Sequence, residues 1–222
     1  MRTVFNDRVD AGRRLAELLT QLNLEKTVVL ALPRGGVPVA AEIARALRAP
    51  LDLVLVRKIG APLQPEVALA AVSDGVEPAL VIDEATLAAS GMPRDYVLGQ
   101  VPRQLQEIER RRHLYLGDRP PIELQGCTAV LVDDGIATGS TVRAALQVLR
   151  LRKPRAVVLA VPVAPAFELP ALRALVDQLV CLKAPEYFSC VGEHYKDFSQ
   201  VGDDEVAALL RASGPDAAHA AD

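Results

Sequence analysis

Ala129-Val-Leu-Val-Asp-Asp-Gly-Ile-Ala-Thr-Gly-Ser-Thr141 is the stretch of sequence that decides the fold of this chain. Its first four residues are apolar and predict a short strand buried inside a parallel sheet. Asp133 and Asp134 follow at the carboxyl end of that strand, where open α/β sheets bind their ligands. The small and hydroxyl-bearing residues 137–141 then lead into a helix that we expect to begin near Thr141.

The residue types after this strand suit a sugar phosphate. Two ionised carboxylates are acceptor-only groups, and the vicinal hydroxyls of a ribose are two donors at a matching separation. Backbone N–H groups and the hydroxyls of Thr138, Ser140 and Thr141 can converge on a phosphate at the positive end of the helix. An isolated Asp-Asp-Gly more often caps a turn, with Gly135 and Gly139 allowing tight geometry. The complete pattern favours a cradle for ribose 5-phosphate.

The same segment resembles the signature with which type I phosphoribosyltransferases bind 5-phosphoribosyl-1-pyrophosphate (PRPP). That signature has four apolar residues, two acidic residues, two apolar or small residues and a small-Thr-Gly-x-Thr/Ser loop, and every position agrees. The resemblance implies that Asp133 and Asp134 bind the ribose hydroxyls. It assigns the 5-phosphate to the loop, which consists of Ala137, Thr138, Gly139, Ser140 and Thr141.

Ala137 departs from one branch of that family. The hypoxanthine-guanine enzymes carry an aspartate at this first loop position, where it works near N7 of the purine. The alanine makes the chain more similar to the adenine and orotate branches. The groups that contact the base must therefore come from elsewhere in the chain.

Strands and helices alternate along most of the sequence. The apolar patterns predict strands at 27–32, 51–56, 128–132, 156–161 and 178–182, and helices at 7–22, 37–47, 141–151 and 170–176. Alternation of this kind predicts an α/β fold with a mostly parallel, Rossmann-like sheet flanked by helices.

Residues 61–126 interrupt the alternation, with short strands predicted at 67–72 and 79–82 and a charged helix at about 95–116. We interpret this region as an insertion that closes over the active site as a lid. In its helix, Arg111 or Arg112 could bind phosphate, although a solvated face of paired charges is the more common arrangement.

We expect one domain over 1–212, followed by a flexible tail over 213–222 that is rich in Ala, Gly and Asp. Segment 184–200 concentrates the aromatic side chains, and Phe188, Tyr195 or Phe198 could stack on a nucleobase as a hood. Covering the end of the sheet as core is the alternative for each of them.

Arg34, Gly35 and Gly36 lie between the first predicted strand and the following helix. The glycines let the backbone approach a ligand closely, and the guanidinium can donate two hydrogen bonds to phosphate oxygens. This position resembles the pyrophosphate loop of the same enzymes, where a strained or cis peptide is common. A plain turn with a surface arginine is the alternative.

Arg57 and Lys58 follow the second predicted strand, in a segment that resembles the Arg-Lys-x-Gly segment of the adenine and orotate enzymes. There the basic pair helps to neutralise pyrophosphate. Lys58 is the stronger candidate, because adjacent side chains of a strand point apart. A structural ion pair made by one of the two is the alternative.

Titratable residues outside these motifs are weaker candidates. Asp83 or Glu84 could serve as the general base, or the pair could simply begin a helix. A lone histidine such as His194 is more often structural than catalytic.

Composition narrows the class of protein. A chain of 222 residues with 50% hydrophobic content supports one sizeable core. The net charge of -3, with arginines spread among acids, disfavours nucleic acid as a partner. We find no signal peptide and no apolar run of the roughly 20 residues that a membrane helix needs, so we expect a cytoplasmic protein. The 3 cysteines lack metal-binding spacing and are expected to be buried free thiols.

The resemblance implies an enzyme that displaces pyrophosphate from C1 of PRPP with a nitrogen nucleophile, such as a nucleobase. It also implies Mg²⁺, bound mainly through PRPP and water. We expect catalysis to depend on Arg34, Lys58, Asp133 and Asp134. Dimers are common in that family, and a homodimer is compatible with this chain. The alternative is a regulator that senses PRPP or a nucleotide and has lost turnover.

Overall fold

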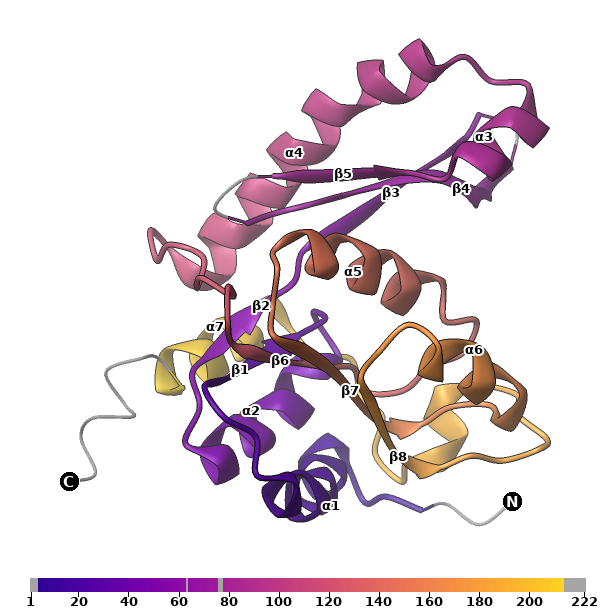
Figure 1. The fold of residues 1–222 in the computed structure, drawn as a ribbon. Helices are drawn as coiled ribbons and strands as arrows, with labels where there is room; N and C mark the ends of the chain where they lie inside the picture. The colour runs from indigo at the N-terminus through magenta and orange to yellow at the C-terminus, as the bar shows by residue number, and fades with distance from the viewer. Residues whose placement is uncertain (1–3, 63, 76–77, 214–222) are drawn as a thin grey trace.

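The computed structural model describes residues 4–62, 64–75 and 78–213 (Figure 1). Its larger sheet has five strands, all parallel, in the order β2-β1-β6-β7-β8. The strands are β1 (Thr27–Ala31), β2 (Leu51–Leu53), β6 (Thr128–Val132), β7 (Ala156–Val163) and β8 (Gln178–Lys183). The predicted α/β class with a parallel sheet is therefore confirmed.

Helices cover both faces of this sheet, because alternate residues of each strand pack to opposite sides. One face packs against α1 (Arg8–Leu19), α2 (Gly36–Leu47) and α7 (Asp203–Ala212). The other packs against α5 (Ser140–Leu151) and α6 (Leu169–Arg173). All five residues of β6 are buried, so only the loops beyond the strand end can offer polar side chains to a ligand.

A second sheet is antiparallel and has the order β3-β4-β5. Its strands are β3 (Val56–Ala61), β4 (Gln64–Ser73) and β5 (Ala79–Ile82), followed by α3 (Glu84–Ser90) and α4 (Arg94–Leu116). Contacts with α4 and with α5 place this sheet between the two helices (Figure 1). Ile59, Leu69, Ala70 and Val72 belong to the same apolar cluster as one face of the parallel sheet, whereas Ala71 packs with Ala144 and Val148 of α5.

One predicted strand, 51–56, is wrong, because the structure divides it. β2 ends at Leu53, and Val56 already pairs with Ser73 in the antiparallel sheet. The N–H of Leu55 donates to the Asp74 carboxylate at 3.1 Å where the chain passes from one sheet to the other. Arg57 and Lys58 consequently lie within a strand and not beyond the end of one.

Other expectations in this region hold. The two short strands exist as β4 and β5, and the charged helix exists as α4. Asp83 caps α3 by accepting a hydrogen bond from the N–H of Thr86, the alternative that the sequence left open for the acidic pair. Helix α7 was not predicted. Of the expected tail, all but Ser213 lies outside the described residues.

The cysteines are free thiols, as expected. Cys190 is exposed, however, while Cys127 and Cys181 are half-buried, so the prediction of buried thiols is wrong. Cys127 and Cys190 lie outside the helices and strands, and Cys181 lies in β8 at the edge of the parallel sheet, where cover by neighbouring segments is incomplete.

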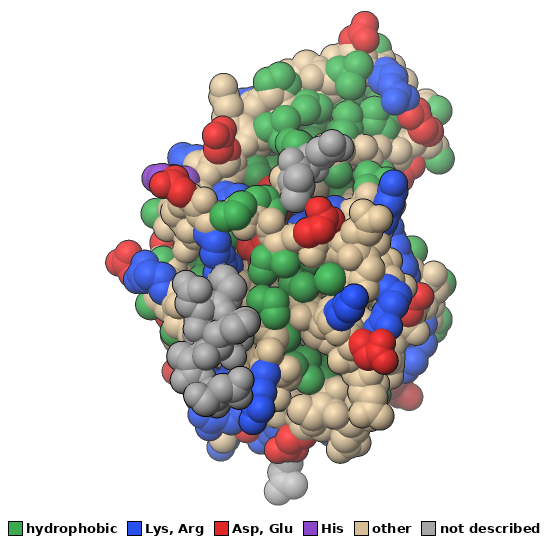
Figure 2. All heavy atoms as spheres, turned by 60° about the vertical axis from the view of Figure 1, so that its left-hand side comes forward, with side chains coloured by type: hydrophobic (Ala, Val, Ile, Leu, Met, Phe, Trp, Pro, Cys, Tyr) green, Lys and Arg blue, Asp and Glu red, His purple; other side chains and the backbone are tan. Residues whose placement is uncertain are grey.

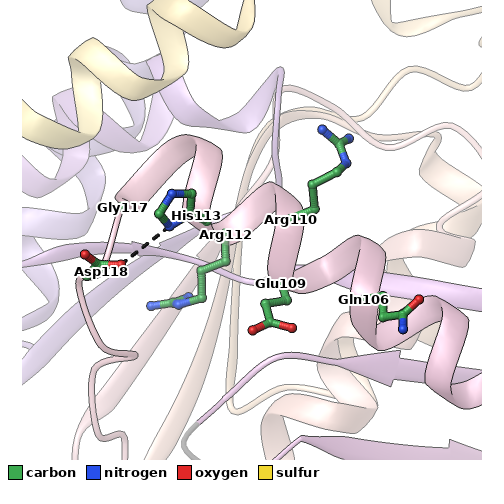
Figure 3. Close-up of a pocket in the computed structure, with 7 residues that line it drawn as sticks. All are labelled: Gln106, Glu109, Arg110, Arg112, His113, Gly117 and Asp118. Carbon is green, nitrogen blue, oxygen red and sulfur yellow. Dashed lines mark ion pairs between the residues drawn. The ribbon is translucent and has the colours of Figure 1, made fainter.

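A buried group of charges joins the two sheets. Arg112 of α4 donates to Asp74 at 2.6 Å and to Asp52 of β2 at 3.3 Å. Asp52 is fully buried and also accepts the N–H of Ile122 at 2.9 Å. The expectation that Arg112 lies on a solvated face is therefore wrong. Figure 3 shows Arg112 and the solvent-facing Arg110 leaving α4 in different directions.

Candidate functional site

The candidate site lies where the order of the parallel strands reverses. The chain proceeds from β1 to β2 toward one edge of the sheet and from β6 through β7 to β8 toward the other. The loops after β1 and β6 are therefore neighbours at the switch point, where α/β sheets bind ligands. The first of these loops holds Arg34, Gly35 and Gly36, and the second begins with Asp133 and Asp134.

The two loops touch. A Cβ on Gly35 would lie 2.0 Å from Oδ2 of Asp134, and a Cβ on Gly36 would lie 2.7 Å from the carbonyl oxygen of Val132. Any larger residue would push the loops apart. The peptide bond between Pro33 and Arg34 is cis. The sequence thus located both glycines, and the structure adds that their missing side chains are what allows this contact.

The acid pair is asymmetric. Oδ1 of Asp133 accepts the N–H of Asp134 at 2.9 Å, and Oδ2 of Asp134 accepts Nε of Arg8 at 2.8 Å. Burial and the neighbouring Asp134 carboxylate hold the pKa of Asp133 well above its ordinary value. Burial also raises the pKa of Asp134, and Arg8 opposes that rise.

The predicted phosphate loop leads directly into α5. Gly139 precedes the helix with φ +70, a left-handed conformation that favours glycine. Ala137 and Thr138 are exposed, and the Thr138 hydroxyl donates to Oγ of Ser140 at 3.3 Å. The first N–H groups of a helix have no partner within it. The loop therefore presents N–H groups and hydroxyls together, and Thr141 lies in the first turn.

Lys58 and Arg57 point in opposite directions from β3, as strand geometry requires. Nζ of Lys58 donates to Oγ of Ser140 in the phosphate loop at 3.1 Å. Nε of Arg57 donates to Gln104 of α4 at 3.1 Å. Two segments 82 positions apart in the chain, β3 and the phosphate loop, therefore meet through one ammonium group.

A small cavity of about 40 Å³ lies between the first loop, β3, α4 and α5. Pro33, Arg57, Arg111 and Thr141 are among its lining residues. Nε of Arg111 donates to Glu107 one helical turn away at 2.8 Å. Of the two arginines that the sequence offered for phosphate binding, Arg111 therefore borders the site and Arg112 does not.

Arg34 is turned toward α7. Its Nη1 lies 3.7 Å from Oδ1 of Asp203, and the same oxygen accepts the hydroxyl of Tyr115 at 2.7 Å. The Arg34 side chain is 38% exposed, so it has room to change rotamer. Within the described residues it makes no ion pair with Asp133 or Asp134.

The aromatic segment 184–200 packs mostly on the chain itself. Tyr195 is buried, and its hydroxyl donates to the carbonyl oxygen of Asp134 at 2.6 Å. Its ring lies 5.0 Å from that of Phe198, and Phe188 stacks on His194 with ring centres 5.5 Å apart. Burial lowers the pKa of His194, in keeping with a structural histidine.

Arg8 is the residue at this site that the sequence did not reveal. In the sequence, Arg8 is simply the residue after Asp7, which caps α1. No sequence pattern distinguishes it from the arginines at 13 and 14. Its contact with Asp134 spans 126 positions, so only the folded chain identifies it.

On the face drawn in Figure 2, Lys and Arg side chains are interspersed with acidic and hydrophobic ones. Within the described residues, no group of three His, Cys, Asp or Glu side chains could hold a metal ion. In the same part of the chain, no helix is both long and apolar enough to cross a membrane.

Comparison with known proteins agrees with this geometry. The model of the phosphoribosyl transferase domain matches residues 5–197. Two curated proteins of Mycobacterium tuberculosis, from strains CDC 1551 / Oshkosh and ATCC 25618 / H37Rv, are each 44% identical over 218 residues, and both are named "Putative phosphoribosyl transferase". The alignment covers 98% of this chain and 48% of each relative, so the chain spans about half their length.

A solved structure is equally similar in sequence. The crystal structure of TT1426 from Thermus thermophilus is 44% identical, with a TM-score of 0.86, and the match covers 95% of this chain and 99% of that one. The family model and the relatives cover both loops of the candidate site. The chain therefore belongs to the phosphoribosyl transferase domain family.

Proposed function

We propose that this chain is an enzyme that transfers ribose 5-phosphate from PRPP to a nitrogen nucleophile, a nucleobase or a related acceptor, and releases pyrophosphate. The observation that carries the proposal is the contact between the Gly35 loop and the Asp134 carboxylate at the switch point of the sheet. It joins two loops that the resemblance assigns to adjacent parts of one ligand, pyrophosphate and ribose.

The donor would bind across three groups of residues. Asp133 and Asp134 would accept the two ribose hydroxyls, and the loop 137–141 would bind the 5-phosphate. Arg34, Gly35 and Gly36 would contact pyrophosphate, with Arg57 and Lys58 adding positive charge from β3. The contact between Lys58 and Ser140 supports an anion-binding role for that ammonium group, because it lies at the phosphate loop without a carboxylate partner among the described residues.

Mg²⁺ fits the residues present. Asp133 and Asp134 place carboxylate oxygens at the strand end, and this ion prefers oxygen ligands and keeps several waters. It would be held mainly by PRPP oxygens and water beside this pair. When bound, it would neutralise charge on the departing pyrophosphate.

The reaction is a substitution at C1 of the ribose. The bond from C1 to the pyrophosphate oxygen breaks, a bond from C1 to the acceptor nitrogen forms with inversion, and that nitrogen loses a proton. Positive charge develops on the ribose ring and negative charge on the leaving group. Arg34 and Lys58 would stabilise the leaving group, at about 3 kcal/mol of barrier for each preorganised contact. Asp133 and Asp134 would position the ribose and favour the developing cation.

Water would destroy the ribosyl cation, so the site must close during the reaction. We propose that region 61–126 acts as the lid and segment 184–200 as a hood over the base, both within one domain over 1–212. The direct hydrogen bond from Tyr195 to the Asp134 carbonyl supports a hood that lies against the donor site.

The test is to incubate the protein with PRPP and Mg²⁺ and a panel of purines, pyrimidines and other nitrogen acceptors, and to measure pyrophosphate release. We expect release with at least one acceptor and a rise in melting temperature with PRPP, because a ligand that binds only the native state stabilises it. Replacing Asp133 and Asp134 together by Ala should abolish that rise. The matched control, Asp118→Ala at a fully exposed carboxylate, should leave it unchanged.

The outcomes separate the enzyme from a regulator. A rise in melting temperature without consumption of any acceptor would favour a protein that senses PRPP. PRPP binding that survives the double alanine variant would contradict the assignment of the acid pair. Absence of any PRPP effect on the unaltered protein would contradict the proposed function.

A further inference from the structure

Arg8 is a largely buried arginine that the proposed reaction does not use. It is the first residue of α1, and its side chain is only 11% exposed. Arginine is almost never buried without partners, because its charge must be compensated. Its contacts therefore indicate what it holds in place.

Three groups from two distant segments surround the guanidinium. Nε donates to Oδ2 of Asp134 at 2.8 Å, and Nη1 donates to the carbonyl oxygen of Ser199 at 2.8 Å. The guanidinium also lies 3.9 Å from the ring centre of Phe198, within the range of a cation–π contact. Arg8 thus joins the start of α1, the acid pair and the aromatic segment.

This arrangement divides the oxygens of the acid pair. Asp134 uses Oδ2 for Arg8, and Asp133 uses Oδ1 for the N–H of Asp134. Within the described residues, Oδ2 of Asp133 and Oδ1 of Asp134 have no hydrogen bond. Both oxygens are accessible, because neither is among the fully buried polar atoms that lack a partner. One open acceptor on each carboxylate remains, which matches the two vicinal hydroxyls of a ribose.

We propose that Arg8 is a positioning residue of the donor site, which orients Asp134 toward the ribose and ties it to the segment 195–199. The inference rests on the proposed function, because the ribose in question is that of PRPP. Arg8 does not contact the ligand in this arrangement and acts through Asp134.

The charges explain why such a residue is needed. Two adjacent carboxylates repel each other, and Arg8 is the only cation paired with either of them among the described residues. Without Arg8, Asp134 would lose the hydrogen bond that fixes its rotamer and the positive charge that offsets its repulsion from Asp133. The remaining acceptor oxygen would then be misplaced for a hydroxyl group.

The experiment measures the dissociation constant for PRPP with Mg²⁺ by calorimetry, alongside the melting temperature, for Arg8→Gln, Arg8→Lys and a control. Arg14→Gln is the control, because Arg14 is also on α1, pairs with Asp10 and lies near an aromatic ring, and its loss changes the net charge equally. We expect Arg8→Gln to weaken PRPP binding at least roughly tenfold, since hydrogen bonds to charged groups are of that strength. Arg8→Lys should recover part of the loss, and Arg14→Gln should bind within twofold of the unaltered protein.

A double-mutant cycle with Asp134→Asn separates positioning from a purely structural role. If Arg8 acts through Asp134, Arg8→Gln should weaken binding much less in the Asp134→Asn background than in the unaltered one. The double variant does not leave an Asp134 carboxylate without its cation, so it keeps the test available if Arg8→Gln alone fails to fold.

The possible failures are distinguishable. Absence of PRPP binding by the unaltered protein overturns the proposed function and this inference with it. Normal binding by the unaltered protein, together with Arg8→Gln binding within twofold of it, overturns the inference alone. A lower melting temperature with an unchanged dissociation constant, or fully additive effects in the cycle, does the same.

Discussion

The parallel and antiparallel sheets carry their polar side chains in different places. Every residue of β6 is buried, so Asp133 and Asp134 come only after the strand ends. In β3 only Ile59 is buried, and Arg57 and Lys58 project from within the strand to opposite sides. A sheet covered on both faces confines ligand contacts to its ends, whereas a partly covered strand can carry them along its length.

The two sheets also differ in what brings their polar side chains to the candidate site. The loops after β1 and β6 are adjacent because their strands pair directly. Lys58 reaches the phosphate loop only because the antiparallel sheet is held against the parallel one. Arg112, Asp52 and Asp74 form the buried ionic connection between them. Changes at this junction should therefore act mainly on the stability of the whole molecule, and changes at the strand ends should also act directly on ligand binding.

The largest effect is expected at that junction. Arg112→Leu leaves Asp74 buried without its cation and Asp52 with only its 3.6 Å ion pair to Arg119, which should lower the free energy of unfolding by about 3–5 kcal/mol. Urea unfolding measures this loss. Arg110→Leu, two positions earlier on the exposed side of α4, should change it by less than about 1 kcal/mol. Equal effects of the two substitutions would contradict the role of the buried charges.

At the end of the parallel sheet, Gly35→Ala should cost about 2 kcal/mol of stability and weaken PRPP binding, because the new methyl group collides with the Asp134 carboxylate. The backbone of Gly35 is helical, with φ -60, so alanine adds no backbone strain there and the expected cost comes from the collision. Gly99→Ala is the control, since nothing lies within 4 Å of its Cβ position, and it should stabilise α4 by up to about 1 kcal/mol. Thermal unfolding with and without PRPP checks both, and an unperturbed Gly35 variant would rule out the close contact.

Within the antiparallel sheet, Lys58→Met should weaken PRPP binding about tenfold, the loss expected for one charge-assisted contact. Arg57→Met should have a smaller effect, because Arg57 already donates to Gln104 of α4. Titration calorimetry compares the two variants directly. A larger loss for Arg57 would reverse the assignment of the two cations.

The smallest effect is a gain in stability. Asp133 has a pKa raised in the folded state, so its ionisation costs stability as the pH rises above the ordinary value of 3.8. Asp133→Asn should therefore raise the free energy of unfolding at pH 7, with the gain disappearing as the pH falls toward 3.8. PRPP binding should weaken in the same variant.

The pKa shift of Asp83 has the opposite sign, because the hydrogen bond from the N–H of Thr86 lowers its pKa. A carboxylate of this kind stabilises the fold above its ordinary pKa and loses that contribution as the pH falls. Asp83→Asn should accordingly give no gain at pH 7. Urea unfolding at pH 7 and pH 4 compares the two variants, and a gain for both would exclude burial as the cause at Asp133.

Local patterns predicted the parallel core well. The apolar runs and glycines located β1, β6, β7 and β8 to within about two residues, because a buried strand must be apolar throughout. They failed at 51–56, where two strands of different sheets follow each other almost without interruption. An apolar run indicates burial, but it does not indicate which sheet buries it.

The sequence by itself determined the fold class, the acid pair, both glycine loops and the pair of cations, because each is a property of neighbouring residues. The tertiary structure alone decided which groups each arginine side chain contacts. It placed Arg112 in a buried junction, Arg111 at the edge of the site and Arg8 against Asp134. The physical reason is that the surroundings of a charged side chain are set by segments far away in the chain, which no local pattern encodes.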